Sequence, residues 1–432
     1  MTISKEKEMG KAFFKEVKQQ LPLISDPVLN QYYNCLGHSL VENAEEVYYP
    51  YYFFIIDKPT LNAFSGPGGY VFMYRGLFLT FDTEDELAAV TAHEIGHVVC
   101  RHIAKRLARN KKLNLATMVA MLAGTLLAGS PEMASAVATT SMATGMAMAL
   151  RYSREDEEEA DRTGLKILLA TGYDGKAMVS AFKKLARFSL GSGGKVPAYL
   201  KTHPNIDVRI VYISNTLKRL PPQKTSHDQT MFHLMQARLR ALFTDRNSAK
   251  VFFTRVLHQN PQDVSAYYGL ALCLIQEKNW PEAVRKLQQA LRLRPKEPLF
   301  ERELGICYAE LGEFSQAIFH LQKAPPDIEV AFYLGLAYQN MQRINAAIAT
   351  WQKAVATFQP DLTLNVSDYS RIYYNLGQLY AAQKQMDWAH YCLGMYFELE
   401  EKPSQARYHL QKALALTHDD KLIKQIKQVQ KK

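Results

Sequence analysis

Two histidines and a glutamate give the clearest chemical signal in the sequence. His93, Glu94 and His97 lie in the run His-Glu-Ile-Gly-His, which is predicted to be helical. Residues i and i+4 of a helix share a face, so the two imidazoles are spaced to bind one Zn²⁺ ion, and Glu94 is placed to act as general base toward water at that ion. Because this pattern also occurs by chance, the alternative is two surface histidines on an ordinary helix. His102, five residues after His97, is expected on another face, as a surface residue.

An acidic run supplies candidates for the third ligand that a catalytic zinc requires. It extends from Ser153 to Asp161, and such a run is most often the solvated face of a helix. Glu157 and Asp161 are again four residues apart, so Glu157 is able to ligate zinc while Asp161 holds the free ring nitrogen of a ligand histidine. By spacing alone, Glu155 or Glu158 would serve equally well as the ligand.

Short β-rich segments and a long helix must position these groups. Residues 51–56 are rich in aromatic and β-branched side chains, and residues 62–74 contain a Gly-Pro-Gly-Gly turn between two further runs of this kind, which predicts a strand and a hairpin. The helix that carries the histidines is expected to start at Asp82 or Thr83, because three acidic residues follow directly. This mixture predicts an α+β domain over residues 1–220.

An internal repeat of small residues occupies residues 229–432, after a polar break at 221–228 that begins with two prolines. The run Trp-Pro-Glu-Ala at 280–283 resembles the tetratricopeptide (TPR) consensus. Five alanines open the second helix of successive pairs, and five small residues lie in the first helices: Ala249, Ala283, Ala317, Ala347 and Ala389, with Ala237, Ala271, Gly305, Gly335 and Gly377. The pattern predicts a TPR solenoid whose concave groove binds peptides or proteins. The alternatives are a plain helical bundle and a purely structural spacer.

The composition limits the class of protein. The 432 residues are enough for two or three domains, and 22% charged residues are too few for a disordered chain. A net charge of +10 is modest at this length. It is compatible with peripheral contact to anionic membranes, and the absence of any nucleic-acid-binding motif argues against nucleic acid as a partner. The five cysteines form no disulfide framework, and three of them, Cys273, Cys307 and Cys392, are expected to be packing residues of the repeat.

Two segments bear on the relation to membranes. Residues 1–20 are charged and amphipathic with no apolar core, so no signal peptide is predicted: the protein is cytosolic, or its leader has been removed. Residues 113–150 contain a single charged residue, Glu132, and divide into two apolar pieces of marginal length for spanning a bilayer. They predict a helical hairpin that lies on the membrane or covers the active site. Two transmembrane helices and a buried hairpin are the alternatives.

Three motifs together resemble one peptidase family. The His-Glu-x-x-His run, the Glu-x-x-Ala-Asp run that begins at Glu157, and Thr202-His203-Pro204 followed by Arg209 are similar to motifs of the gluzincin peptidases of the HtpX and CAAX-prenyl-peptidase family. The resemblance implies one zinc ion per chain with Glu157 as its third ligand, and it places Asp161 and Arg209 in the surrounding shell.

The same resemblance implies two further roles. In relatives with this layout the histidine of Thr-His-Pro sits on the zinc, so His203 would be a fourth ligand in a latent state and move aside in an active one. Asn62, Ala63 and Phe64 would form an edge strand on which substrate adds as a β-strand. The alternatives are that His203 merely caps a helix or lies in a loop, and that residues 62–64 belong to a core hairpin.

These observations lead to one overall interpretation. We expect a mainly helical α+β protein, with a zincin-like metalloendopeptidase domain at 1–220 and a TPR domain at 229–432. By resemblance, it acts in cell-envelope quality control in the periplasm, cleaves unfolded or misassembled outer-membrane proteins, and contacts the β-barrel assembly complex through its TPR groove. The alternatives are a chaperone or scaffold with a latent zinc site, and a related quality-control peptidase of another compartment.

Overall fold

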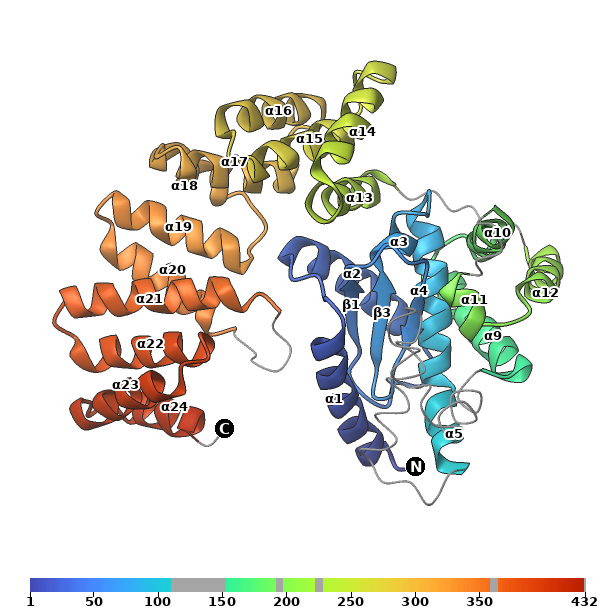
Figure 1. Cartoon of the computed structure of the whole chain (residues 1–432), viewed down its shortest axis with the longest axis horizontal. Coiled ribbons are helices and arrows are strands. Elements are labelled where there is room, and N and C mark those ends of the chain that lie inside the picture. The colour runs from blue at the N-terminus through green and yellow to red at the C-terminus, as the bar shows by residue number, and fades with distance from the viewer. Residues whose placement is uncertain (110–151, 192–196, 222–227, 358–363, 431–432) are drawn as a thin grey trace. The chain divides into compact units, whose positions relative to one another are not determined.

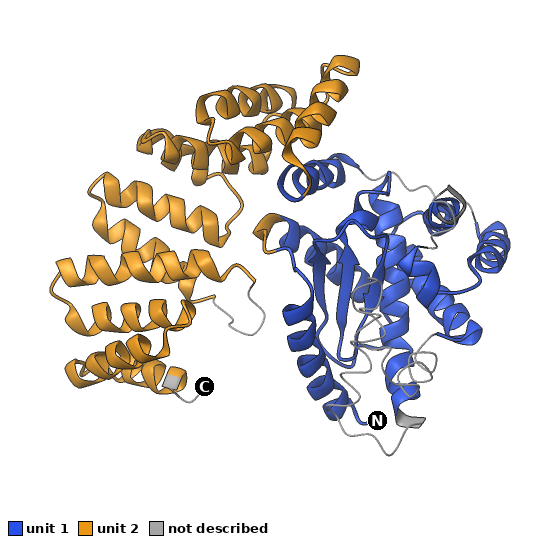
Figure 2. Cartoon of the chain, viewed as in Figure 1, with its two compact units in different colours: residues 1–24, 29–243 blue, residues 25–28, 244–432 orange. Residues whose placement is uncertain are grey.

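The computed structural model describes residues 1–109, 152–191, 197–221, 228–357 and 364–430 (Figure 1). The predicted apolar hairpin at 113–150 lies outside these residues. Within the described part of the chain, no helix is both long and apolar enough to cross a membrane. The chain divides into two compact units (Figure 2): unit 1 comprises residues 1–24 and 29–243, and unit 2 comprises residues 25–28 and 244–432.

A three-stranded sheet lies at the centre of unit 1. Its strands are β1 (Tyr52–Ile56), β2 (Ala63–Ser65) and β3 (Tyr70–Tyr74), in the order β1-β3-β2. β1 pairs with β3 in parallel, and β2 pairs with β3 antiparallel, with Phe64 opposite Phe72. The predicted strand and hairpin are therefore confirmed to within one residue. β2 lies at one edge of this sheet.

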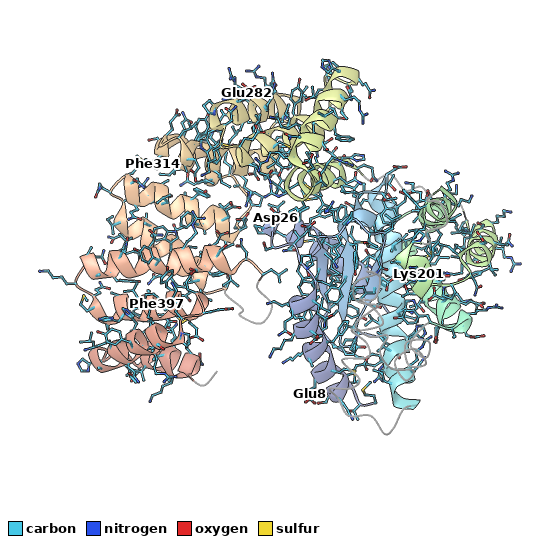
Figure 3. The ribbon with its side chains drawn as sticks, in the orientation of Figure 1. Glu8, Asp26, Lys201, Glu282, Phe314 and Phe397 are labelled. Atoms are coloured by element: carbon cyan, nitrogen blue, oxygen red, sulfur yellow. The ribbon has the colours of Figure 1, made fainter. Side chains whose placement is uncertain are left out.

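Helices cover both faces of the sheet. α1 (Ile3–Gln20) buries Phe13 and Phe14, whose rings contact Phe64 and Phe72 on one face, and leaves Glu8 exposed (Figure 3). The other face carries α2 (Pro27–Val41), whose Tyr33 ring contacts Phe53 of β1, and α4 (Glu84–Val99), which contacts β2 and β3. This arrangement places α4, with its histidines, directly beside β2.

Both helices of the motif region begin at capping residues. The side chain of Thr83 accepts a hydrogen bond from the Glu86 backbone N–H at 3.3 Å, so of the two predicted caps Thr83 starts α4. α9 (Arg154–Ala170) begins at Ser153 in a reciprocal capping box with Asp156. The acidic first turn of α9 is also favoured by the positive end of the helix dipole. Here the acidic run starts a helix, and it is not wholly solvated.

Short helices complete unit 1. They are α3 (Arg75–Phe78), α5 (His102–Arg109), α10 (Lys176–Gly191), α11 (Ala198–Thr202), α12 (Ile206–Lys218) and α13 (Thr230–Phe243). α13 is part of this unit because its Gln236 side chain donates to the carbonyls of Phe78 and Phe81 at 3.1 and 2.7 Å. The Phe232 ring also stacks on Phe78, with 5.8 Å between centroids.

Unit 2 consists of stacked antiparallel helices, as predicted for a repeat. They are α14 (Arg246–Gln259), α15 (Val264–Gln276), α16 (Trp280–Leu293), α17 (Pro298–Glu310), α18 (Phe314–Leu321), α19 (Ile328–Asn340), α20 (Ile344–Val355), α21 (Val366–Ala382), α22 (Met386–Leu399), α23 (Pro403–Leu416) and α24 (Asp420–Gln430). Each helix packs on its sequence neighbour (Figure 1). Cys273, Cys307 and Cys392 are buried, which confirms that they pack inside the repeat.

Small residues set the helix crossings of unit 2. A Cβ atom built on Gly335 of α19 would lie 2.2 Å from the indole nitrogen of Trp351 on α20, and one on Gly305 of α17 would lie 2.5 Å from Leu321 on α18. Trp351 is fully buried, and its indole N–H donates to the carbonyl of Phe332 at 3.2 Å. The glycines therefore make room for large side chains of the partner helix, as the repeat pattern predicted.

Candidate metal centre

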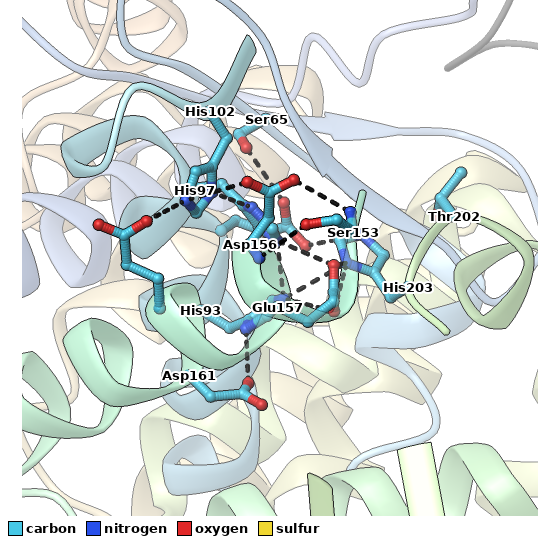
Figure 4. Close-up of polar contacts among 12 residues, drawn as sticks. Ser65, His93, His97, His102, Ser153, Asp156, Glu157, Asp161, Thr202 and His203 are labelled. Atoms are coloured by element: carbon cyan, nitrogen blue, oxygen red, sulfur yellow. Dashed lines mark hydrogen bonds and ion pairs between the residues drawn. The ribbon is translucent and has the colours of Figure 1, made fainter. Parts of the chain in front are cut away.

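Four buried side chains from three segments of unit 1 converge on one point (Figure 4). His93 and His97 of α4 approach each other to 3.0 Å between their Nε2 atoms. Glu157 of α9 lies 3.4 Å from His97 Nε2 and 3.7 Å from His93 Nε2. His203, directly after α11, brings its Nδ1 to 3.0 Å from Glu157 Oε1 and 3.3 Å from His93 Nε2. No side chain of the four is more than 2% exposed.

Close contact between α4 and α9 brings these groups together. A Cβ atom built on Gly96 of α4 would lie 2.5 Å from the carbonyl oxygen of Ala160, and one on Gly164 of α9 would lie 2.8 Å from that of Ala92. Only glycine allows two helix backbones to approach this closely. Because Gly96 is one residue before His97, and Ala160 lies between Glu157 and Asp161, the contact fixes the distance between the ligands of the two helices.

The acidic run on α9 has one buried and one solvated side. Glu157 and Asp161 are buried and face α4. Glu155 is exposed, and Glu158 is exposed and paired with Arg162. Spacing alone left three candidates for the third ligand, and the structure brings Glu157 alone of these to the histidines.

His93 is held from behind by a carboxylate and a guanidinium. Its Nδ1 lies 2.8 Å from Asp161 Oδ1. Asp161 in turn accepts two hydrogen bonds from Arg209 at 2.7 Å each and a further one from the Tyr212 hydroxyl. Arg209 also lies 2.5 Å from Glu157 Oε2 and packs over the Phe182 ring. Both residues that the family resemblance placed around the ligands therefore contact them.

His97 is held from behind by His102, and this corrects the sequence-based expectation. His102 was predicted to be a surface residue, but its side chain is fully buried and its Nδ1 lies 2.8 Å from His97 Nδ1. The prediction assumed that the helix continues past His97. Instead α4 ends at Val99, and Arg101 adopts a left-handed conformation with φ of 54°. The chain turns there, and α5 starts with His102 directed back at His97.

Glu94 lies beside the cluster without being part of it. It is fully buried, and its Oε2 accepts a hydrogen bond from the Ser65 hydroxyl at 3.2 Å. Its Oε1 lies 3.5 Å from His203 Nε2, and neither of these two atoms has a hydrogen-bond partner among the described residues. A buried carboxylate oxygen without a hydrogen-bond partner calls for an explanation, and a water molecule or an ion at that position is one.

Aromatic rings enclose His203 on both sides. The ring of Tyr199 stacks on it at 4.3 Å between centroids, and that of Tyr152 lies on the other side at 5.2 Å. Tyr152 also stacks on His97 at 3.8 Å. Both phenol hydroxyls are buried and lack a hydrogen-bond partner within the described chain. His203 is thus held among the other three ligands by packing as well as by polar contacts.

The part of the chain that carries this centre is similar to a known protein family. Residues 27–217 match the model of peptidase family M48. These residues therefore form a peptidase family M48 domain. Residues 244–300, 274–329 and 329–359 match tetratricopeptide repeat models, so an M48 domain precedes TPR repeats.

Curated proteins are similar to this chain over part of its length. The chain is 35% identical over 300 residues to the putative beta-barrel assembly-enhancing protease of Vibrio cholerae, covering 68% of this chain and 62% of the relative. It is 33% identical over 305 residues to the beta-barrel assembly-enhancing protease of Escherichia coli K12, covering 68% and 61%. It is 30% identical over 151 residues to the mitochondrial metalloendopeptidase OMA1 of Arabidopsis thaliana, covering 35% and 28%. The chain thus covers less than two thirds of the length of each of these relatives.

The M48 centre fits a zinc ion. Two imidazoles and a carboxylate form a donor set that zinc favours, and four tetrahedral ligands at about 2.0 Å from zinc are about 3.3 Å apart. The distances between ligand atoms here, 3.0 to 3.7 Å, bracket that separation. His93, His97, Glu157 and His203 would hold one such ion, as metallopeptidases of the family use zinc.

The charges around the M48 ligands compensate one another. Burial lowers the pKa of His97 well below its ordinary value. Burial would raise the pKa of Glu157, but the neighbouring charges of His203 and Arg209 outweigh it and hold that pKa well below the usual range. Arg209 and His93 likewise lower the pKa of Asp161 against the effect of burial. A neutral His97 and an ionised Glu157 are the forms that ligate zinc.

The proposed substrate strand lies next to these ligands. Asn62, Ala63 and Phe64 are buried, and Asn62 and Phe64 pair with β3. Pairing alternates along an antiparallel strand, so the backbone groups of Ala63 and Ser65 point away from β3 toward the free edge. Among the described residues no backbone hydrogen bond reaches them from another segment. The unpaired edge, called the free edge, is therefore carried by Ala63 and Ser65, and both residues are buried in this structure.

Sequence reasoning missed several members of the M48 centre. His102, Tyr152 and Tyr199 were not assigned to it, although each contacts a ligand histidine. For the tyrosines the sequence holds no periodic signal, since each contacts the centre from outside the motif helices. Gly96 and Gly164 were detectable: small residues spaced at four, Ala92 with Gly96 and Ala160 with Gly164, mark a close helix contact.

Proposed function

We propose that this chain is a zinc-dependent metalloendopeptidase in which His93, His97 and Glu157 hold zinc and Glu94 is the general base. One observation carries the proposal. A complete donor set is buried at one point, and beside it lies a buried carboxylate with an oxygen that accepts no hydrogen bond within the described chain. A structural zinc site would need no such carboxylate. The match of residues 27–217 to a peptidase family supports the same reaction.

Zinc bound there supplies a Lewis acid that polarises the scissile carbonyl and lowers the pKa of water toward 7. Glu94 accepts a proton from the water whose oxygen adds to the carbonyl carbon. It passes that proton to the amine nitrogen as the carbon–nitrogen bond breaks. Ser65 holds Oε2 of Glu94, which leaves Oε1 free for this proton.

Asp161 and Arg209 position the ligands. Asp161 accepts the Nδ1 proton of His93, so Nε2 keeps its lone pair for the metal. Arg209 orients Asp161 through two parallel hydrogen bonds and neutralises part of the buried negative charge of Glu157. Loss of Arg209 would leave two carboxylates buried with too little positive charge nearby.

The free edge of β2 is proposed to bind substrate. Ala63 and Ser65 offer backbone groups to an extended peptide, which would lie alongside Glu94 because the Ser65 side chain contacts that residue. This refines the expectation for Asn62, Ala63 and Phe64: Ala63 pairs with substrate, while Asn62 and Phe64 anchor the strand to β3.

His203 is proposed to restrain the enzyme. It approaches three ligands and both faces of its ring are covered, so it fills the coordination position that a catalytic zinc keeps open. Activation then requires His203 to leave its place between Tyr152 and Tyr199.

Substrate class, partner and compartment are proposed from the relatives. Those from Vibrio cholerae and Escherichia coli are called beta-barrel assembly-enhancing proteases. We propose by analogy that this chain cleaves unfolded or misassembled outer-membrane proteins in the periplasm, and that its TPR unit contacts the β-barrel assembly machinery. The TPR matches support a protein-binding role for that unit.

The test compares three proteins of known zinc content on an unfolded substrate such as casein. They are the unsubstituted chain, His203→Ala, and the double variant His203→Ala/Glu94→Gln. We expect His203→Ala to cleave faster than the unsubstituted chain and the double variant to be inactive. Cleavage by the double variant would exclude Glu94 as the base. If none cleaves although zinc is bound, the chaperone or scaffold interpretation replaces the protease.

A further inference from the structure

We propose that His102 and Glu159 form a hydrogen-bonded relay that fixes the tautomer and ring orientation of His97 as a metal ligand. This inference rests on the proposed zinc site and adds two positioning residues to it. His102 belongs to none of the three motifs, and Glu159 occupies a variable position of the Glu-x-x-Ala-Asp run, on the outer side of α9.

The relay is a continuous line of three side chains. His97 Nε2 faces the metal position, while its Nδ1 lies 2.8 Å from His102 Nδ1. His102 Nε2 lies 2.9 Å from Glu159 Oε2. His102 is fully buried, whereas the side chain of Glu159 is 51% exposed. The line therefore runs from the buried centre to solvent.

The direction of each hydrogen bond follows from the first. A neutral His97 that ligates through Nε2 carries its proton on Nδ1, and the acceptor that this proton reaches among the described residues is Nδ1 of His102. His102 must then carry its own proton on Nε2, where it donates to the Glu159 carboxylate. Each ring nitrogen that bonds within the line is thus either the donor or the acceptor of one hydrogen bond. The opposite tautomer of either histidine would place a proton on Nε2 of His97, the atom that ligates the metal.

The groups around His102 support this polarity. Lys105 of α5 lies 3.6 Å from Glu159 and favours its ionised form. Asp156 is the other carboxylate near His102 Nε2, but its Oδ1 is 3.8 Å away, beyond hydrogen-bond distance, and Arg106 and the Ser153 backbone N–H bond to its other oxygen, Oδ2. Glu159 is therefore the acceptor of the His102 proton. Tyr152 packs against His102 and His97 and keeps their rings in place.

One competing arrangement exists. Ligand atoms of Cys100, His102 and Glu159 lie within 4.8 Å of one another and so could hold a second metal. A metal on His102 Nε2 would force its proton to Nδ1, and His97 would then be protonated at the atom that faces the first metal. With neutral rings, the relay and a second metal exclude each other, which makes zinc stoichiometry a direct test.

Two variants of one residue separate positioning from packing. His102→Asn keeps an acceptor close to the position of Nδ1, whereas His102→Gln places its amide near Nε2 and leaves His97 without an acceptor. We expect His102→Gln to weaken zinc binding about 10-fold or more, within the range for lost outer partners, and His102→Asn to stay within about threefold of the unsubstituted chain. Zinc affinity is measured on the full chain by competition with a chromophoric chelator.

Controls make each outcome decisive. Glu158→Gln, on the neighbouring exposed position of α9, should leave affinity unchanged, and thermal unfolding of the metal-free proteins reports packing damage separately. Equal zinc affinity for His102→Asn and His102→Gln would overturn the relay. So would two zinc ions per unsubstituted chain falling to one in Cys100→Ser. If the unsubstituted chain binds no zinc, the proposed function itself fails and the relay fails with it.

Discussion

Two helix contacts in this molecule use glycine in opposite ways. Between α4 and α9, Gly96 and Gly164 let one backbone meet another, with no side chain between them. Between α19 and α20, Gly335 leaves a space that the Trp351 ring fills. The first contact sets a distance between metal ligands. The second packs an apolar core, and its exact helix separation serves no chemistry.

The difference indicates how each contact tolerates change. A side chain can adopt another rotamer when a neighbouring residue is replaced by a larger one. Such a substitution in the repeat contact therefore costs packing energy, and a smaller residue on the partner helix compensates for it. Two backbones have no such freedom. An added methyl group between α4 and α9 must move a whole helix, and Glu157 and Asp161 move with it.

The largest effect on zinc affinity is expected from replacing Glu157, the ligand that α9 contributes beside the histidines of α4. Zinc binding worth about 10–16 kcal/mol, shared among four ligands, gives about 3 kcal/mol for each. Glu157→Gln should therefore weaken zinc binding more than about 100-fold. Glu158→Gln, one residue away and exposed, should bind zinc normally. Chelator competition on both proteins measures this, and a stronger loss in Glu158→Gln would reassign the ligand.

The second largest effect on zinc affinity is expected from disturbing the backbone contact between α4 and α9. Gly96→Ala places a methyl group 2.5 Å from the Ala160 carbonyl oxygen, which forces the helices apart. We expect zinc affinity to fall about 10- to 100-fold, comparable with loss of an outer partner, although no ligand is altered. Ala89→Gly, on the same helix, is the control for altered helix propensity. Normal zinc affinity in Gly96→Ala would mean that the contact does not set the ligand distance.

The repeat contact should respond with stability alone. Gly335→Ala brings a methyl group against Trp351 and should cost about 1–3 kcal/mol in the free energy of unfolding of unit 2, with zinc affinity unchanged. Adding Trp351→Phe should restore part of the loss, since the smaller ring vacates the space. Urea unfolding followed by circular dichroism gives these values. No rescue by the double substitution would contradict the side-chain origin of the strain.

The smallest effect on zinc affinity is expected from a truncation after residue 243, which removes unit 2 but keeps α13. Residues 1–243 keep α13, which hydrogen-bonds α3 and the following turn, so zinc affinity should stay within about twofold of the full chain. Residues 1–228 lack α13 and should be less stable, as seen by thermal unfolding. Partner capture should be lost in both. Zinc loss from residues 1–243 would show that the two units depend on each other.

The sequence predicted those parts of the fold that depend on local pattern. Helix periodicity and caps gave α4 and its start at Thr83, the Gly-Pro-Gly-Gly turn gave the β2–β3 hairpin, and repeated small residues gave unit 2. The parallel pairing of β1 with β3 was not predicted, because it joins segments that are distant along the chain.

Only those site residues that motif spacing identifies could be predicted from the sequence. Spacing placed His93 and His97 on one face but left Glu155, Glu157 and Glu158 as alternatives, since choosing among them requires the orientation of α9 on α4. His102 was misplaced because one residue, Arg101, adopts a left-handed conformation. Its guanidinium bonds to the Glu6 carboxylate at 2.9 and 3.0 Å, a contact across 95 residues that no local pattern reveals.

Under the proposed function, the short free edge of β2 limits how firmly unit 1 would hold a peptide by itself. Ala63 and Ser65 offer two N–H and two C=O groups, and at about 1 kcal/mol net for each hydrogen bond they contribute about 4 kcal/mol. That corresponds to a dissociation constant of about 1 mM. A second attachment elsewhere on the same chain raises the local concentration of a bound protein into the millimolar range. Proteins bound by the TPR repeats would thus be cleaved efficiently, although the edge of β2 binds peptides weakly and with little sequence preference. Proteins that the repeats do not bind would be left uncut.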